Sequence, residues 1–339
     1  MTEATTEPSQ RRGTATRVSL IILVVLLLLL LCGALWVLLS LANEPQRVPV
    51  LDKLPGVKYE FSAFGGSFGR LDHPVGIAYD GKDRIYVTES TLGKVLVFDS
   101  RGRNGRVFVD TASHVIRNPA GVDVGPDGLV YVADPGQSKL FVFDTQGRKV
   151  REISTTGAAW VHVAGDRIYT LTTGTLFVTD LQGNALGQWG TFGRGPSQLA
   201  YPGGVTVDPA RRMYVTDLNN YRVVALDPDF NRVWQVGETA LTQKAADKRG
   251  LGGPTGITLG GDGNIYFLDG MSSNIHVVDK SGKEISKPLS GPGSADNQLY
   301  LPRSIDWMND DLFVIADTFH NRIVGLRLNP QPVGTGTSK

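Results

Sequence analysis

The residues of this chain best suited to bind a metal ion are its five histidines. A structural zinc site needs four ligands and a catalytic one needs three, all converging on one point. The single cysteine excludes a cysteine-rich zinc site and an intramolecular disulfide. Whether the imidazoles converge depends on how the fold places them: His73, His114, His162, His276 and His320.

Two further segments imitate known sites. Gly65–Gly69 matches the G-x-S-x-G pattern of serine hydrolases, but that motif needs a helix after it, and here another strand pattern follows. A calcium loop is imitated by four residues, yet Arg232 stands where the loop needs glycine. We interpret the first as a glycine-rich loop and the second as a plain hairpin turn: Asp227, Asp229, Asn231 and Glu238. No metal or other cofactor is predicted.

The elements that must position these residues follow from a repeat of about 45 residues. Counting from a proline, glycine recurs at +2, tyrosine at +12 and an acidic residue at +15, with exceptions in the last copy. A degenerate copy, with Gly157 in place of the proline, fills the gap before Pro202. The chain thus holds six units over 58–328. The intact copies begin at Pro74, Pro119, Pro202, Pro254 and Pro302.

Each unit alternates short apolar runs with turns, which predicts four strands per unit. In the first unit these are 76–79, 84–88, 94–98 and 107–110. The sixth unit stops after its third strand, and we expect 59–64 to supply the fourth and close the ring. The predicted fold class is therefore all-β, a six-bladed β-propeller.

The repeated residues are expected to be structural, because a functional site usually breaks a repeat. The acid at +15 ends the second strand, where it can accept backbone N–H groups near a turn. The glycine at +2 permits close approach where six inner strands converge. The acids are Glu89, Asp134, Asp217, Asp269 and Asp317.

The blade sequences resemble the NHL repeat. The resemblance lies in "YPGGVTVDPARRMYVTDLNNYRVV" and its counterparts in other units, in the lead-in "FGRGPSQLAYPGG", and in "FHNRIVGL" of the last unit. It covers about 80% of the chain and implies a six-bladed propeller of NHL type. Propellers of this family serve as binding platforms, as exported sensor domains of membrane kinases, and as a few metal-dependent enzymes.

The enzymes of this type suggest an alternative function. Peptidylglycine amidating lyase holds zinc with channel histidines from alternate blades, but only His73 directly precedes a blade-start proline. His162, in the inner strand of the degenerate blade, could face the channel, although a buried structural histidine is the favoured interpretation. The Glu, Asn and Asp set of gluconolactonase-like lactonases cannot be mapped onto this chain. The positions that match His73 are Asn118, Tyr201, Gly253 and Leu301.

The start of the chain predicts a membrane anchor. Residues 18–42 are almost entirely apolar and long enough to span a bilayer as a helix. Three arginines precede them, so we expect residues 1–17 in the cytoplasm and the propeller in the periplasm or outside the cell. Cleavage of a signal peptide after Ala42 is the rival interpretation. Residues 43–57 form a proline-containing linker, and 329–339 a disordered tail.

The loops between second and third strands, and those that lead into each blade, should share one face. There we place the candidate binding residues His73, Arg117, Asn118, Tyr201, Asn219, Asn220, Tyr221, Arg303 and His320. An insertion, 239–249, is predicted to form a short helix over this face. Aromatic and arginine side chains beside asparagine are typical of binding surfaces.

The sequence therefore predicts a membrane-anchored, extracytoplasmic and non-enzymatic module that binds a protein or small ligand. A metal-dependent lyase or lactonase that works at the central channel is the alternative, and a structural part of a larger envelope complex is a third. The formal net charge of +1 argues against a nucleic-acid binder.

Overall fold

The computed structural model describes residues 56–238 and 251–330. The predicted segments 1–17 and 18–42, the helix expected over 239–249, all but the end of the linker 43–57 and most of the tail 329–339 lie outside this part of the chain. Within the described ranges, none of the helices has the length and apolar character needed to cross a bilayer.

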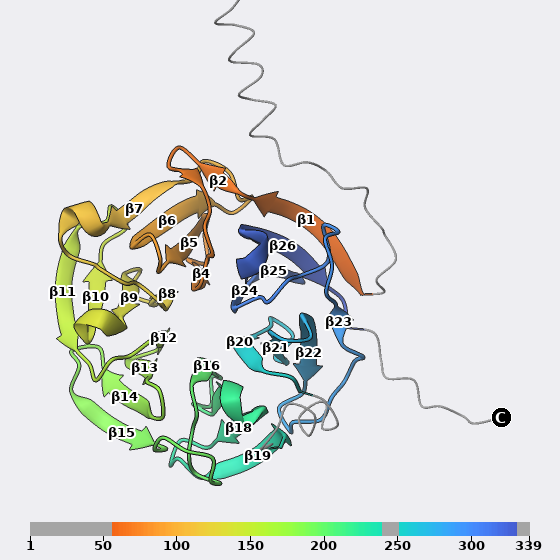
Figure 1. Cartoon of the computed structure of the whole chain (residues 1–339). Helices are drawn as coiled ribbons and strands as arrows, with labels where there is room; N and C mark the ends of the chain where they lie inside the picture. Colours follow the sequence, from red (N-terminus) through yellow and green to blue (C-terminus); the bar gives the residue numbers. More distant parts are fainter. Residues whose placement is uncertain (1–55, 239–250, 331–339) are drawn as a thin grey trace, which may run out of the picture. The chain divides into compact units, whose positions relative to one another are not determined.

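Six four-stranded antiparallel sheets stand as blades around a central channel (Figure 1). Blade 1 contains β4 (Ile77–Tyr79), β5 (Arg84–Glu89), β6 (Lys94–Asp99) and β7 (Arg106–Asp110). Blade 2 contains β8 (Val122–Val124), β9 (Val130–Asp134), β10 (Lys139–Phe143) and β11 (Lys149–Ser154). Blade 3 contains β12 (Trp160–Ala164), β13 (Arg167–Leu171), β14 (Leu176–Asp180) and β15 (Ala185–Trp189).

Blade 4 contains β16 (Pro202–Val207), β17 (Met213–Asp217), β18 (Arg222–Leu226) and β19 (Arg232–Gly237). Blade 5 contains β20 (Pro254–Leu259), β21 (Ile265–Asp269), β22 (Asn274–Val278) and β23 (Leu289–Ser290). Blade 6 contains β24 (Ser304–Asn309), β25 (Leu312–Asp317), β26 (Arg322–Leu328) and β1 (Val57–Ala63). A small hairpin, β2 (Gly65–Gly66) and β3 (Gly69–Arg70), follows β1, and four 3-10 turns complete the described elements: η1 (Thr111–Ser113), η2 (Pro135–Gln137), η3 (Leu218–Asn220) and η4 (Thr318–His320).

The predicted all-β, six-bladed propeller is confirmed, and so are the four strands of the first unit to within one residue. In blade 3 the sequence alignment was wrong by one residue. His162 pairs with Tyr169 as Asp123 pairs with Tyr131. The turn between those strands is one residue shorter in blade 3, so Ala158 and not Gly157 occupies the blade-start position.

The core is divided among the spaces between blades. Six clusters of buried apolar side chains each draw on two adjacent blades. Between blades 6 and 1, for example, Ile85 and Leu96 belong to the same cluster as Val314 and Ile323. Because each blade buries both of its faces in this way, the apolar stabilisation of the ring depends on its closure.

The ring closes as predicted from the sequence. β1 pairs antiparallel with β26 from Val57 opposite Leu328 to Ala63 opposite Ile323. Figure 1 shows this first strand of the chain beside the last. The backbone N–H of Asn329 donates to the carbonyl of Gly56 at 2.8 Å, which continues the pairing beyond the strand ends.

The repeated acids are structural, and their hydrogen bonds span more of the sequence than the sequence analysis expected. Each buried carboxylate accepts the backbone N–H of the residue 17 positions earlier, in the loop that leads into its own blade. In blade 4, the N–H of Ala200 donates to Asp217 at 2.8 Å, and the Asp217 side chain is fully buried. The acid thus fixes the start of the inner strand to the end of the second strand.

The glycines at +2 permit the close approach predicted for them. A Cβ added to Gly256 would lie 2.6 Å from the Cα of Ser304 in the next blade. The two imitation motifs are also turns. Ser67 lies in the turn between β2 and β3 and donates to the carbonyl of Gly105, and Asp227 accepts the N–H groups of Asp229 and Asn231 within a hairpin.

Candidate functional site

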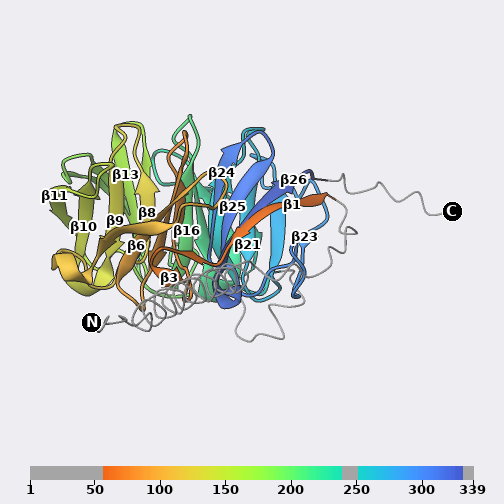
Figure 2. The same ribbon diagram turned by 90° about the horizontal axis from the view of Figure 1, so that it is seen from above.

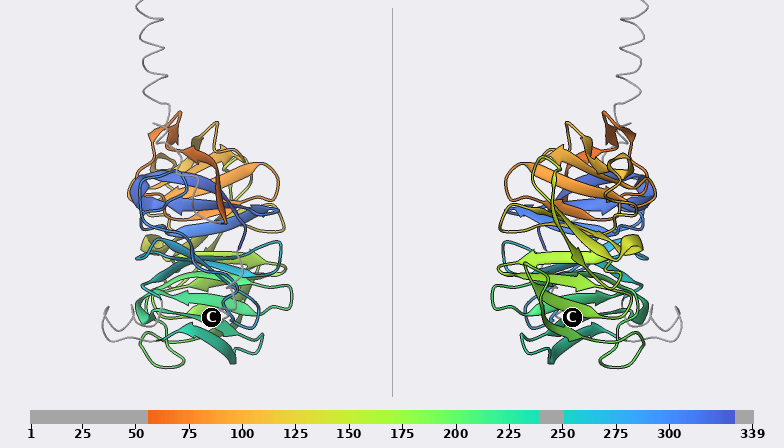
Figure 3. Two further views of the ribbon diagram at one scale, coloured as in Figure 1. Left: turned by 90° about the vertical axis from the view of Figure 1, so that its right-hand side faces the viewer. Right: turned by 90° about the vertical axis from the view of Figure 1, so that its left-hand side faces the viewer.

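The described part of the chain from residue 56 to 330 is a disc, and its strands run between two faces (Figures 2 and 3). One face carries the residues that begin each inner strand and the ends of the second strands, which the Asp217–Ala200 bond brings together. We call it the proline face, after Pro74, Pro119, Pro202, Pro254 and Pro302. The structure thus places the two kinds of loop on one side, as the sequence analysis expected.

The candidate binding residues lie on this proline face, but they differ in availability. The exposed members are Arg117, Asn118, Tyr201, Asn219 and Arg303. Three others are partly buried: His73, Tyr221 and His320. The His73 ring contacts Phe319 of blade 6 edge-to-face at 5.2 Å, and its Nδ1 lies 2.5 Å from Asp72 Oδ1.

Two candidates hold the fold together and offer little to a partner. Asn220 is fully buried, and its Nδ2 donates to the carboxylate of Asp217 at 2.7 Å and to the carbonyl of Gly193 at 3.0 Å. Nδ1 of His320 lies 2.7 Å from the buried carboxylate of Asp317. The placement of Asn220 in an accessible surface was therefore wrong, because η3 turns this side chain inward.

Exposed apolar side chains gather on the proline face. Nine large apolar residues of the described ranges are exposed, and six of them lie in loops of this face. The other three, Val150, Leu186 and Val233, lie on the outermost strands. The six are Leu92, Phe192, Tyr201, Met271, Tyr300 and Phe319.

The aromatic members form two groups that sequence reasoning identified only in part. Phe192 contacts Tyr201 edge-to-face at 5.6 Å beside blade 4. Tyr300 contacts Phe319 at 5.7 Å beside blade 6, and Phe319 continues the group to His73. Tyr201 and His73 stood among the candidates, and Phe319 was expected on the same face, whereas Phe192 and Tyr300 were missed. Tyr201 lies one position before a blade-start proline, and Tyr300 lies two positions before the next such proline but one. This proximity was the available signal.

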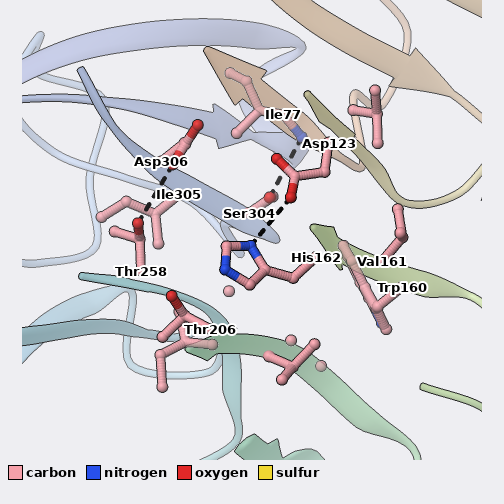
Figure 4. Close-up of a pocket in the computed structure, with 16 residues that line it drawn as sticks. Ile77, Asp123, Trp160, Val161, His162, Thr206, Thr258, Ser304, Ile305 and Asp306 are labelled. Carbon is pink, nitrogen blue, oxygen red and sulfur yellow. Dashed lines mark hydrogen bonds and ion pairs between the residues drawn. The ribbon is translucent and has the colours of Figure 1, made fainter. Parts of the chain in front are cut away.

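A second candidate site lies in the channel. A cavity of about 50 Å³ is lined by the first four positions after the blade starts, the part of each inner strand next to the proline face. Figure 4 shows the side chains that surround it. The residue at +4 pairs with the residue at +12 in five blades and, because the turn is one residue shorter, with the residue at +11 in blade 3. These positions make one ring of six: Ala78, Asp123, His162, Thr206, Thr258 and Asp306.

Two carboxylates of this ring connect neighbouring blades. Asp123 Oδ2 accepts the N–H of Val163 in blade 3 at 2.7 Å, and Asp306 Oδ2 accepts the N–H of Tyr79 in blade 1 at 2.7 Å. Asp306 Oδ1 also accepts the hydroxyl of Thr258 at 3.3 Å. Each aspartate therefore ties its inner strand to the next while it lines the cavity.

His162 combines the two roles that the sequence analysis weighed. Its Nδ1 lies 3.0 Å from Asp123 Oδ2, and its side chain is 27% exposed, toward the channel. Burial lowers the pKa of His162, but the hydrogen bond to Asp123 and the nearby carboxylates outweigh burial and raise it overall. Burial, together with the charge of Asp123, raises the pKa of Asp306 to about 7.

The side chains that could ligate a metal are spread out. Over residues 56–238 and 251–330, no three His, Cys, Asp or Glu side chains are arranged to hold one metal ion. The described histidines do not converge either. His73 and His320 lie on the proline face, His114 is exposed at the end of η1, His162 lines the channel, and His276 stacks on Phe267 within blade 5.

The fold is shared with solved propellers of several activities. A streptogramin B lyase is 17% identical, with a TM-score of 0.57 over 80% of this chain and 97% of that one. A gluconolactonase from Xanthomonas campestris is 13% identical, with a TM-score of 0.57 over 80% and 89%. A chain of the nidogen–laminin complex is 18% identical, with a TM-score of 0.51 over 65% and 80%. No protein-family model matches the chain, and likeness at these identities shows the six-bladed propeller fold alone.

Proposed function

We propose that this protein is a membrane-anchored, extracytoplasmic propeller of NHL type that acts as a binding module or scaffold. Its partner is a protein or a small ligand that docks on the proline face. The observation that carries the proposal is the gathering of six of the nine exposed large apolar side chains on this one face. Exposed apolar side chains that gather on one face favour an interaction site on that face.

Buried carboxylates fix the loops that present these side chains through hydrogen bonds, and such fixed loops are suited to binding. Tyr201 follows Ala200, whose N–H is bound by Asp217, and the N–H of Tyr300 is bound by Asp317 at 2.8 Å. Loops fixed in this way lose little conformational entropy when a partner binds, so more of the interaction energy appears as affinity. Likeness to a chain of the nidogen–laminin complex is consistent with a propeller that binds a protein.

The location rests on the sequence. The apolar run 18–42 would serve as a single membrane-spanning anchor, with residues 1–17 in the cytoplasm and the propeller in the periplasm or outside the cell. Protease treatment of intact cells or spheroplasts that carry a C-terminal tag tests this arrangement. A protected tag, or a mature protein that starts at Asn43, would show that it is wrong.

Crosslinking capture of partners from membranes tests the binding face. The double variant Tyr201→Ala with Arg303→Ala should lose the captured partner, because both side chains are exposed on the proline face. Truncation of a true hot-spot residue costs about 2 kcal/mol or more of binding free energy. Lys283→Ala, in the loop between β22 and β23 on the opposite face, is the matched control. Loss of the partner in the control and its retention in the double variant would refute the proposed face.

A metal-dependent lyase or lactonase that works at the channel is the second candidate. It is favoured by the titratable side chains of the cavity, Asp123, His162 and Asp306, and by likeness in fold to a lyase and a gluconolactonase. One tightly held metal ion per purified chain, with lactone or lyase turnover lost in His162→Ala, would establish this candidate in place of the binding module.

A further inference from the structure

Three features at the proline-face end of the channel depart from the repeat. Trp160 stands in blade 3 at the +2 position, where the four blades 1, 2, 4 and 5 have glycine. Asp123 and Asp306 stand at +4, where blades 4 and 5 have threonine. All three side chains line the same cavity. Departures that converge on one point are unlike the scattered variation of a purely structural repeat.

The charges around the cavity do not balance. Asp123 has His162 as its partner at 3.0 Å. The hydrogen bonds of Asp306 come from the backbone N–H groups of Tyr79 and Trp307 and from the Thr258 hydroxyl. Among the ion pairs of residues 56–238 and 251–330, none includes Asp306. A carboxylate in a confined site is stabilised by a cation more than by neutral donors alone.

The remaining walls suit a compact cationic group on an apolar stem. The hydroxyls of Thr206, Thr258 and Ser304 line the cavity beside the two carboxylates and offer further acceptors. An ammonium group has three N–H donors and fits a small volume, whereas guanidinium is a larger planar group. The indole of Trp160 and the side chain of Val161 provide a surface for methylene groups, and an indole face also attracts a cation.

We propose that the channel mouth on the proline face receives the ammonium group of a lysine side chain carried by a protein partner. This inference rests on the proposed binding function and names the chemistry at its centre. The ammonium nitrogen donates to Asp306 and Asp123, and the lysine stem passes Trp160. The aromatic groups around Tyr201 and Tyr300 contact the residues that flank the lysine in the partner.

The binding should strengthen as the pH rises. The titratable groups that face the cavity are Asp123 from β8, His162 from β12 and Asp306 from β24; the other three inner strands contribute no charged side chain to its wall. A cation favours ionised Asp306, whose pKa of about 7 leaves it largely protonated at pH 6. Deprotonation of His162 also removes a competing positive charge, so both changes act in the same direction.

The full-length protein in detergent micelles, titrated with Nα-acetyl-lysine methylamide and followed by calorimetry and by tryptophan fluorescence, tests the site. The norleucine analogue, which has the same stem length without the charge, is the matched probe. We expect saturable binding of the lysine probe alone, stronger at pH 8 than at pH 6. Asp306→Asn and Asp123→Asn should each weaken it about tenfold or more, as loss of a charged hydrogen-bond partner does. Equal binding of both probes, or wild-type affinity in both variants, would overturn the proposal.

A further pair of measurements separates this inference from the proposed function. If Asp306→Asn lowers the melting temperature, Thr258→Val replaces it, because this change removes one acceptor and leaves the backbone bonds of Asp306 in place. Thr258→Val should weaken the lysine probe severalfold, and unchanged affinity would count against the site. Partner capture that survives Asp306→Asn but not the Tyr201 and Arg303 double variant would refute the lysine site and leave the binding module standing.

Discussion

Blades 4 and 6 share a buried ion pair, and blade 3 differs from both. Arg222 pairs with Asp217 at 2.8 Å in blade 4, and Arg322 pairs with Asp317 at 2.7 Å in blade 6, exactly 100 residues further along the chain. The guanidinium of each also binds carbonyls of the glycine-rich lead-in before its blade. Blade 3 has Thr172 in place of the acid and forms no such pair.

The difference separates two uses of the same repeat. In blades 4 and 6, the repeated residues fix the loops that carry Tyr201 and Tyr300. Blade 3 lacks this device but places His162 and Trp160 in the wall of the channel. Residues that match the repeat stabilise the ring. Residues that depart from the repeat provide the side chains that line the channel.

The largest expected effect comes from the source of the fourth strand, which differs between blades 4 and 6. Blade 4 takes its fourth strand, β19, from its own repeat, whereas blade 6 takes β1 from the start of the chain. A chain that begins at Gly65 should aggregate or melt far below one that begins at Asp52, because β26 becomes an open edge. Equal melting temperatures in differential scanning fluorimetry would show that blade 6 does not need β1.

Removal of an acid should distinguish blades 4 and 6 from blade 3. Asp217→Ala leaves the 2%-exposed Arg222 without its partner, and we expect a loss of about 3–5 kcal/mol in the free energy of unfolding. Asp317→Ala should cost a similar amount. Thr172→Ala, at the equivalent position of blade 3, removes hydroxyl bonds to Gly174 and Thr175 and should cost about 1 kcal/mol. Denaturant titration measures the free energy of unfolding of all three variants. Equal losses would show that blade 3 does not differ from blades 4 and 6 in this respect.

The glycine at +2 provides a smaller test. Gly256→Ala places a methyl group 2.6 Å from the Cα of Ser304 and should destabilise the fold by about 1–3 kcal/mol through overpacking. Gly136→Ala is the control, since its nearest neighbour, Asp134 Oδ1, would be 3.5 Å away. If the two variants have the same melting temperature, the inner strands have more space between them than the structure shows.

A further test concerns pH. The pKa of Asp306 is raised to about 7 from an ordinary value of 3.8, so between these values the folded state holds a proton that the unfolded state has lost. The contribution of this group to the free energy of unfolding is therefore fully present below pH 4, and it is lost as the pH rises to 7. Asp306→Asn should flatten the decline in melting temperature between pH 5 and pH 8.

Asp227→Asn is the control for this measurement. Hydrogen bonds from Asn231 and neighbouring N–H groups lower the pKa of Asp227, so its carboxyl is ionised in both states across the range from pH 5 to pH 8. This variant should keep the wild-type decline. A variant of Asp306 with the full wild-type decline would show that this carboxyl does not titrate there.

The fold was predictable because its determinants recur. Proline, glycine and the acid at +15 appear at fixed offsets, and closure by β1 followed from the sixth unit having three strands. The 17-residue span of each acid's hydrogen bond was not predictable in the same way, since it depends on how the loop packs after the sheet has formed.

The site was harder to predict, because its residues do not recur. Asn219 and Asn220 are neighbours in η3, yet one is exposed and the other buried, and sequence spacing alone does not separate them. Phe192 and Tyr300 have no counterpart in most blades. Comparison of the six residues at +4 would have revealed Asp123 and Asp306, but a position that holds Ala, Asp, His and Thr shows no pattern until strand pairing defines it.

Closure by β1 also decides how the ring responds to mechanical load. β1 enters at the face opposite the prolines and runs toward them, while its partner β26 runs the other way. A pull on the first residue of β1 along the axis of this strand acts parallel to its partner β26. Hydrogen bonds between antiparallel strands lie perpendicular to that axis, so the load is shared among all of them in shear and does not open them one at a time. The pairing of β1 with β26 thus resists tension applied along β1.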